Sequence, residues 1–212
     1  GEEGSTDIAI EPILSGGDVT ICVTGLDKIP YIVTIPAASL DGAYIVYNDV
    51  QCENTVYGAY VNPTVTLKNV GVQAANNVNV TLSTESPYID ILNSTATVAS
   101  IAPDATVDIN DFGFDVSVDI PDQTRVQFFV TCVSGNETWE SKFNLTFNAP
   151  KFATSNIFNT DLTPGGTGTA TFQITNIGHA DAENAIFEVY ASSDDLALES
   201  NVIEIGAIAA GE

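Results

Sequence analysis

Alternation of apolar and polar residues is the strongest pattern along this chain. In the segment Phe112–Ile120 every second residue is apolar, and the residues between them are small or acidic. A period of two is typical of a β-strand with one buried and one solvated face. Downstream, Ser134-Gly135-Asn136-Glu137 favours a hairpin turn between two further alternating strands. The residues predicted to face inward in this hairpin are Val126, Phe128, Val130 and Cys132, followed by Trp139, Phe143, Leu145 and Phe147.

Upstream, the same alternation predicts another pair of strands around the turn Asn69-Val70-Gly71. Val65 and Leu67 precede this turn on the buried face, and Val78, Val80 and Leu82 follow it. No segment shows a convincing helical period. The chain is also rich in Val, Ile, Thr, Phe and Tyr, whereas Lys and Arg together number 5 and Met is absent. This composition favours strands over helices, so the sequence predicts an all-β protein.

An internal repeat relates two parts of the chain. Asn69-Val70-Gly71 recurs as Asn176-Ile177-Gly178, and we call the spacing from Asn69 to Asn176 the repeat offset. The same spacing holds without a gap and preserves the apolar alternation on both sides of the motif. Further identical pairs at the repeat offset are Gly58 with Gly165, Thr64 with Thr171, Ala75 with Ala182, Asn77 with Asn184, Ser86 with Ser193, and Ile101-Ala102 with Ile208-Ala209.

The length of the repeat defines the predicted domains. A period of roughly 100 residues suits one immunoglobulin-like β-sandwich and is too long for a solenoid repeat. The complete copy covers residues 41–149, and residues 150–212 correspond to the N-terminal part of a third module. Residues 1–40 are then the C-terminal part of a preceding module. We therefore predict tandem immunoglobulin-like β-sandwich modules, one complete between two partial ones.

Charge narrows the classes of partner. The net charge is −23, from 28 acidic and 5 basic residues, and this disfavours binding to nucleic acid or to anionic membranes. No apolar run is long enough to insert across a bilayer.

The aspartates between residues 104 and 122 could suggest calcium, but two of them lie on the solvated face of a strand and no EF-hand loop is present. A solvated surface is preferred, so no cofactor is predicted and calcium remains the alternative. These aspartates are Asp104, Asp108, Asp111, Asp115, Asp119 and Asp122.

The cysteines do not predict an active site. A cysteine nucleophile needs a neighbouring histidine base, and the only histidine, His179, lies in the turn of the partial third module. All three cysteines, Cys22, Cys52 and Cys132, lie outside that module. Cys132 shares a buried row with apolar residues, while a disulfide between Cys22 and Cys52 stays open. No catalytic, cofactor-binding or metal-binding residue is therefore predicted.

Several short motifs follow one another along the chain in a recognisable order. They are Asp18–Gly25, Ile29–Ile32, Thr66–Gly71 with Ala75–Val78, Ser86–Ile89, Glu137–Ser141, Leu145–Pro150 and Leu162–Gly166. In this order they resemble the immunoglobulin-like modules that follow the catalytic domain of gingipain-type cysteine peptidases, and modules of related secreted bacterial surface proteins. Gly166 departs from the glutamate that is usual at its position in these modules.

The resemblance implies a secreted or cell-surface location and a parent protein with a cysteine peptidase domain. No motif of that catalytic domain has a counterpart in this chain, so the chain itself is not expected to be an enzyme. We expect a structural and interaction region that supports its own catalytic domain or another neighbouring domain. The alternative is a stand-alone adhesion module that binds a surface glycan or a protein. The incomplete third module is expected to pair with a neighbouring chain or to be mobile, because its strand edges lack partners.

Overall fold

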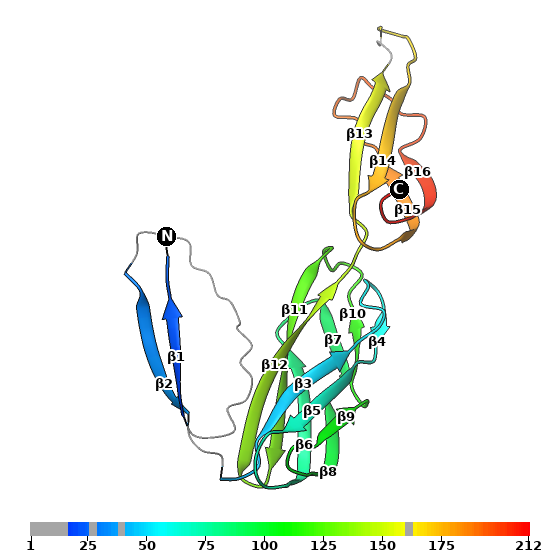
Figure 1. Ribbon diagram of the computed structural model, residues 1–212. Helices are drawn as coiled ribbons and strands as arrows, with labels where there is room; N and C mark the ends of the chain where they lie inside the picture. The colour runs from blue at the N-terminus through cyan, green and yellow to red at the C-terminus, as the bar shows by residue number, and fades with distance from the viewer. Residues whose placement is uncertain (1–16, 26–28, 38–40, 160–162) are drawn as a thin grey trace.

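The computed structural model describes residues 17–25, 29–37, 41–159 and 163–212, and every regular element within them is a β-strand (Figure 1). The predicted all-β class is confirmed. The strands are β1 (Gly17–Val23), β2 (Tyr31–Ala37), β3 (Ile45–Gln51), β4 (Tyr60–Val61), β5 (Thr64–Asn69), β6 (Ala75–Thr84), β7 (Ile89–Asn93), β8 (Thr95–Ile101), β9 (Thr106–Ile109), β10 (Gly113–Val116), β11 (Thr124–Ser134), β12 (Glu137–Phe147), β13 (Phe152–Asn159), β14 (Ala170–Asn176), β15 (Ala182–Glu188) and β16 (Val202–Ile208).

Strands β3 to β12 form three antiparallel sheets around one apolar core. We call residues 41–149, which contain these strands, the middle segment. The sheet orders are β12-β11-β6-β8, β3-β5-β9 and β4-β10-β7. Tyr47 of β3 stacks on Phe143 of β12 with ring centroids 5.2 Å apart, and Phe114 of β10 lies 5.1 Å from Phe128 of β11. Both three-stranded sheets therefore pack against the four-stranded sheet.

The predicted hairpin rows are buried as expected. Strands β11 and β12 pair from Thr124↔Phe147 to Ser134↔Glu137, and Gly135 takes the left-handed conformation in the turn between them, with φ of 59°. All eight residues predicted to face inward are less than one-tenth exposed. Burying such rows of aromatic and aliphatic side chains is the main contribution to folding.

The strand predicted at 112–120 is wrong in its second half. Strand β10 ends at Val116, and the Val118 side chain is 69% exposed. The reason is local: the Ser117 Oγ accepts a hydrogen bond from the Asp119 N–H, and the Ile120 N–H donates to the Ser117 carbonyl. A serine that binds the backbone two residues ahead favours a turn over a strand.

The remaining described strands form two-stranded sheets. Strands β13 and β14 pair with each other, as do β15 and β16, and we call residues 150–212 the C-terminal segment. The pairing Ile45↔Asn69 in the middle segment recurs as Phe152↔Asn176. Likewise, Ala75↔Ile101 recurs as Ala182↔Ile208. The repeat offset thus relates strand pairing as well as sequence.

Strands β1 and β2 form a hairpin of their own, from Gly17↔Ala37 to Val23↔Tyr31. They belong to the predicted partial module 1–40, of which residues 1–16, 26–28 and 38–40 lie outside the described residues. None of the described residues forms a helix long and apolar enough to cross a membrane.

Candidate functional site

Asn69, at the end of β5, is fully buried and forms a bracket between strands. Its Nδ2 group donates to the carbonyls of Gln73 and Ile101, at 2.8 and 2.9 Å. Its Oδ1 atom accepts from the N–H groups of Gly71 and Tyr44, at 2.9 and 3.1 Å. Both amide protons and two acceptor positions of the side chain are therefore used, which is what burial of a polar group requires.

Asn176 forms the same bracket at the end of β14 and is also fully buried. Its Nδ2 group donates to the carbonyls of Ala180 and Ile208, at 2.9 and 3.2 Å. Its Oδ1 atom accepts from the N–H groups of Gly178 and Lys151, at 3.0 and 3.1 Å. All four partners are separated from their counterparts around Asn69 by the repeat offset. We call this arrangement the asparagine bracket.

The glycine of each Asn-x-Gly motif is required by a close backbone contact. A Cβ atom on Gly71 would lie 2.4 Å from the Gly42 carbonyl oxygen, and one on Gly178 would lie 2.3 Å from the Ala149 carbonyl oxygen. Real Cβ contacts are not this short, so only glycine fits beside the asparagine. The sequence predicted a turn here but not the bracket. The recurrence of Asn and Gly together at the repeat offset is the signal from which a buried structural role of the two asparagines could have been predicted.

Asp122 joins the middle segment to the C-terminal segment. Its Oδ1 atom accepts hydrogen bonds from the backbone N–H groups of Ala149 and His179, both at 3.1 Å. Its Oδ2 atom lies 2.8 Å from the His179 Nδ1 atom. The Asp122 side chain is 6% exposed and the His179 side chain 58% exposed. One carboxylate thus holds both the connecting chain and the Asn-x-Gly turn of the C-terminal segment.

The environment of Asp122 lowers its pKa. Burial acts to raise the pKa, but the hydrogen bonds from the His179 ring and from the Ala149 and His179 N–H groups, with the charge of His179, outweigh it. A carboxyl group whose pKa is depressed in the folded protein contributes stability above its ordinary pKa of about 3.9. That contribution is lost as the pH falls through the lower folded value.

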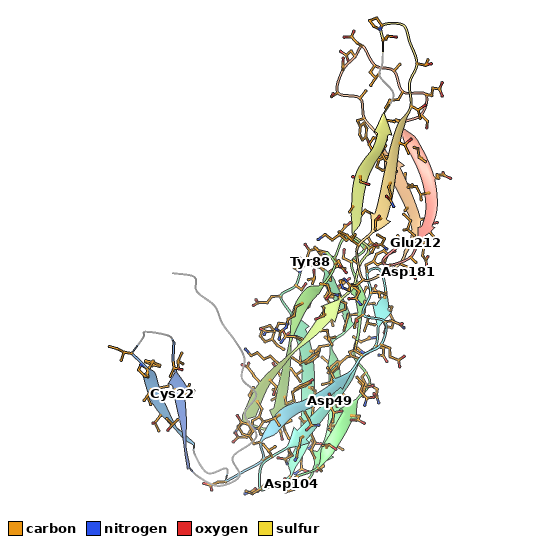
Figure 2. All side chains as sticks on the ribbon, turned by 45° about the horizontal axis from the view of Figure 1, so that its top comes forward. Cys22, Asp49, Tyr88, Asp104, Asp181 and Glu212 are labelled. Atoms are coloured by element: carbon orange, nitrogen blue, oxygen red, sulfur yellow. The ribbon has the colours of Figure 1, made fainter. Side chains whose placement is uncertain are left out.

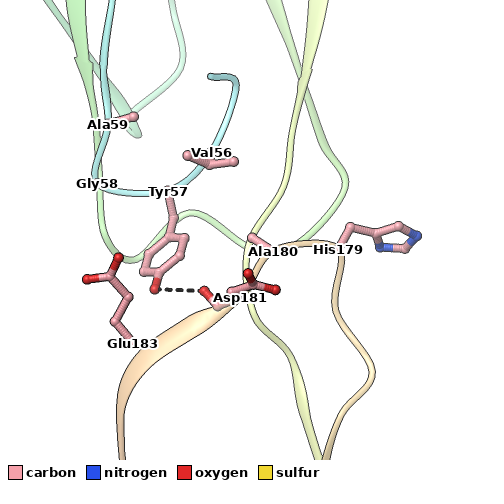
Figure 3. Close-up of a pocket in the computed structure, with 8 residues that line it drawn as sticks. All are labelled: Val56, Tyr57, Gly58, Ala59, His179, Ala180, Asp181 and Glu183. Atoms are coloured by element: carbon pink, nitrogen blue, oxygen red, sulfur yellow. Dashed lines mark hydrogen bonds between the residues drawn. The ribbon is translucent and has the colours of Figure 1, made fainter. Parts of the chain in front are cut away.

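A hollow lies beside this junction and is lined by both segments (Figure 3). The Tyr57 hydroxyl donates to the Asp181 carbonyl at 3.1 Å and thereby forms a second contact between the segments. Figure 2 places Asp181 at the junction and Asp104 at the far end of the middle segment. The lining residues are Val56, Tyr57, Gly58, Ala59, His179, Ala180, Asp181 and Glu183.

The structure does not bring cysteine and histidine together. His179 faces Asp122, while Cys22 is exposed, Cys52 is half-buried and Cys132 is buried, all as free thiols. Burial raises the pKa of Cys52 and of Cys132 to about 11. Both thiols are therefore protonated near neutral pH and are poor nucleophiles.

The aspartates weighed for calcium are spread over separate elements. Asp108 accepts a hydrogen bond from the Thr66 hydroxyl, Asp115 lies on β10, and Asp122 lies at the junction. Within the part of the chain that the structure describes, no three His, Cys, Asp or Glu residues form a group that could hold a metal ion.

Comparison with known proteins leaves the function open. No family model and no curated protein matches this chain. Among solved structures, the crystal structure of BslA, a bacterial hydrophobin, aligns with 51% of this chain and 95% of its own, at 11% identity and a TM-score of 0.25. A likeness this weak carries no argument about fold or function.

Proposed function

We propose that this chain is a non-catalytic structural and interaction region built from tandem immunoglobulin-like modules, with the complete module at 41–149. The observation that carries the proposal is the asparagine bracket, which recurs with all four partners displaced by the repeat offset. A repeated buried polar group that only satisfies backbone groups serves the fold of each unit. Two consecutive units that are each stabilised by the same asparagine bracket suit a spacer.

The junction supports the role of spacer. Asp122 and Tyr57 of the middle segment contact the turn 179–181 of the C-terminal segment through three hydrogen bonds. Several hydrogen bonds from different elements restrict rotation about the short connection after Ala149. A region with restricted junctions would present a neighbouring domain at a defined distance and orientation.

The location and parent protein rest on the resemblance of motifs. We infer that the region belongs to a secreted or cell-surface bacterial protein of the gingipain type, in which it would contact its own catalytic domain. The succession of Asn69-Val70-Gly71, Trp139 and its neighbours, and Leu145–Pro150 supports this. The full gene tests it: a cysteine peptidase domain is expected, and a gene without one would refute this part of the proposal.

The absence of catalysis is tested directly. We expect the chain to show no saturable hydrolysis of a fluorogenic peptide library near neutral pH, because His179 binds Asp122 and not a cysteine, and because Cys52 and Cys132 are protonated. The variants Cys22→Ser, Cys132→Ser and His179→Gln serve as controls for a contaminating peptidase, whose activity they would leave unchanged. Saturable hydrolysis that any of these variants abolishes would refute the proposal.

A stand-alone binding module is the alternative, and the junction hollow favours it. Tyr57 contributes an aromatic ring, and Asp181 and Glu183 contribute carboxylates that could accept hydrogen bonds from a sugar or a protein. A glycan and protein array tests this function. Saturable binding that Glu183→Gln weakens would favour the alternative, and an array without reproducible binding would count against it.

A further inference from the structure

Two parts of the middle segment run side by side in the same direction. Strand β3 follows the point where the chain enters the middle segment, and β12 precedes the point where the chain leaves it. Val56, which follows β3, and Asn148, which follows β12, form a parallel bridge. In Figure 1 both strands point toward the junction. We call the contact between residues 45–57 and residues 137–148 the parallel seam.

Hydrogen bonds and a ring contact hold the parallel seam together. The Tyr57 N–H donates to the Asn148 carbonyl, and the Asn148 N–H donates to the Thr55 carbonyl, both at 2.9 Å. Nearer the start of β3, the Tyr47 N–H donates to the Ser141 Oγ atom at 3.1 Å. The ring of the same tyrosine stacks on a phenylalanine of β12. The seam is therefore bonded near both of its ends.

The chain enters and leaves the middle segment at opposite ends. At the entry, the Asn69 side chain binds the Tyr44 N–H, and the Asn69 carbonyl accepts from the Asp104 N–H at 2.8 Å. At the exit, the Ala149 N–H donates to Asp122. Figure 2 shows Asp104 at the end of the middle segment opposite the junction. Tension along the chain would therefore pull β3 and β12 along their own axes in opposite directions.

This arrangement places the strand contacts under shear. When two parallel strands are pulled apart along their axes, all the hydrogen bonds between them must break together. The same holds for the antiparallel pairs that join β3 to β5 and β12 to β11. When strands are pulled apart sideways from one end, the bonds break one after another and each breaks at a lower force. Forced unfolding is governed by this barrier and not by the equilibrium stability.

The asparagine brackets lie where tension would enter each segment. Asn69 binds the N–H of Tyr44 directly before β3, and Asn176 binds the N–H of Lys151 directly before β13. Both asparagines are fully buried. Each bracket thus fixes the incoming chain to the interior of its segment.

We propose that the middle segment is a tension-bearing link, in which the parallel seam and the bracket at its entry resist force transmitted along the chain. Resistance to tension deepens the proposed role of spacer and rests on it. The two properties fail separately, because the orientation of a spacer depends on the junction, whereas resistance to tension depends on contacts within residues 41–149.

Pulling the full chain in two directions tests the proposal. Gly42→Cys with Lys151→Cys attaches handles for axial pulling, and Gly42→Cys with Asn136→Cys attaches them for transverse pulling. Cys22→Ser and Cys52→Ser remove the thiols that are not buried. A Cβ at position 42 meets no atom within 4 Å, and positions 136 and 151 are exposed, so the new cysteines fit the fold.

The two directions load the parallel seam differently. Because Tyr47 lies beside Ser141, position 42 lies near position 136, at the start of both strands. Transverse pulling therefore opens the seam from one end, whereas axial pulling shears it. In optical tweezers at one loading rate, the axial unfolding force should be at least about twofold higher than the transverse force. Equal forces, or a lower axial force, would overturn the proposal.

A pair of serine variants locates the resistance in the seam. Ser141→Ala removes the acceptor of the Tyr47 N–H and should raise the rate of axial unfolding at a given force about fivefold. Ser100→Ala is the matched control, because it removes a hydrogen bond to Asn76 that lies outside the seam, and it should leave this rate unchanged. Equal effects of the two variants would contradict a resisting seam. Trp139 fluorescence reports whether each variant is folded, and the comparison of pulling directions decides if one is not.

Discussion

The side chain at position 69 is completely buried, and an apolar residue would be compatible with that environment. Four backbone groups around it would then lose their hydrogen-bond partner. The N–H groups of Gly71 and Tyr44 and the carbonyls of Gln73 and Ile101 all bind the Asn69 side chain. A buried group without a partner costs more than a typical hydrogen bond contributes. The asparagine therefore stabilises the fold through its neighbours, and position 176 repeats the same solution.

Removing the bracket should weaken the middle segment strongly. Asn69→Ala leaves two backbone N–H groups without their acceptor, so the free energy of unfolding should fall by about 3 kcal/mol. Urea denaturation followed by Trp139 fluorescence measures this, because Trp139 is the only tryptophan and is buried in β12. The exposed Asn93→Ala is the matched control and should change the value little. Equal effects of the two variants would contradict the role of the bracket.

Gly71, which lies beside the bracket, should not tolerate a larger side chain. Gly71→Ala places a Cβ 2.4 Å from the Gly42 oxygen and the Tyr44 nitrogen, so the backbone must move and stability should fall by about 2 kcal/mol or more. Gly42→Ala is the control, since a Cβ there meets no atom within 4 Å. Thermal denaturation of both variants compares them. A Gly71→Ala protein as stable as Gly42→Ala would show that the close contact is not maintained.

At the scale of elements, the alternation of apolar and polar residues predicted which side chains of a strand are buried, but it did not predict where every strand ends. The buried side chains of β11 and β12 could be predicted from the sequence, because all of them belong to one apolar core. The end of β10 at Val116 does not, because Ser117 forms a turn that a regular period cannot indicate. The junction was also inaccessible to sequence reasoning, since Asp122 and His179 are far apart in the sequence and meet only in the folded chain.

The junction should respond to acid through Asp122. Its pKa is below the ordinary value, so the contact is complete above about pH 4 and is lost as the pH falls through the lower folded pKa. Amide protection factors of Ala149 and His179, corrected for intrinsic exchange, should decrease together over that acidic range. Asp122→Asn should remove this pH dependence, whereas Asp119→Asn in the neighbouring turn should leave it unchanged. Protection that does not vary with acid in the native chain would contradict the assigned role of Asp122.

At the scale of the molecule, the strand pairings and brackets recur at the repeat offset and the junction connects them. The repeat was visible in the sequence because Asn, Gly and the apolar rows recur together. The relation of one segment to the next was not, because it depends on Tyr57 and Asp122, which lie outside the recurring motif. A spacer requires both properties, since stable units joined by a free hinge would not hold a neighbouring domain in a defined orientation.

The rotational diffusion of the two segments tests the proposed spacer most directly. We predict that ¹⁵N relaxation at neutral pH gives one rotational correlation time for the strand amides of residues 41–149 and of residues 163–212. Asp122→Ala combined with Tyr57→Phe should shorten the correlation time of residues 163–212 selectively, because these changes remove the side-chain hydrogen bonds of Asp122 and Tyr57 across the junction. Distinct correlation times for the two segments in the native chain, unaffected by the two substitutions, would contradict the account.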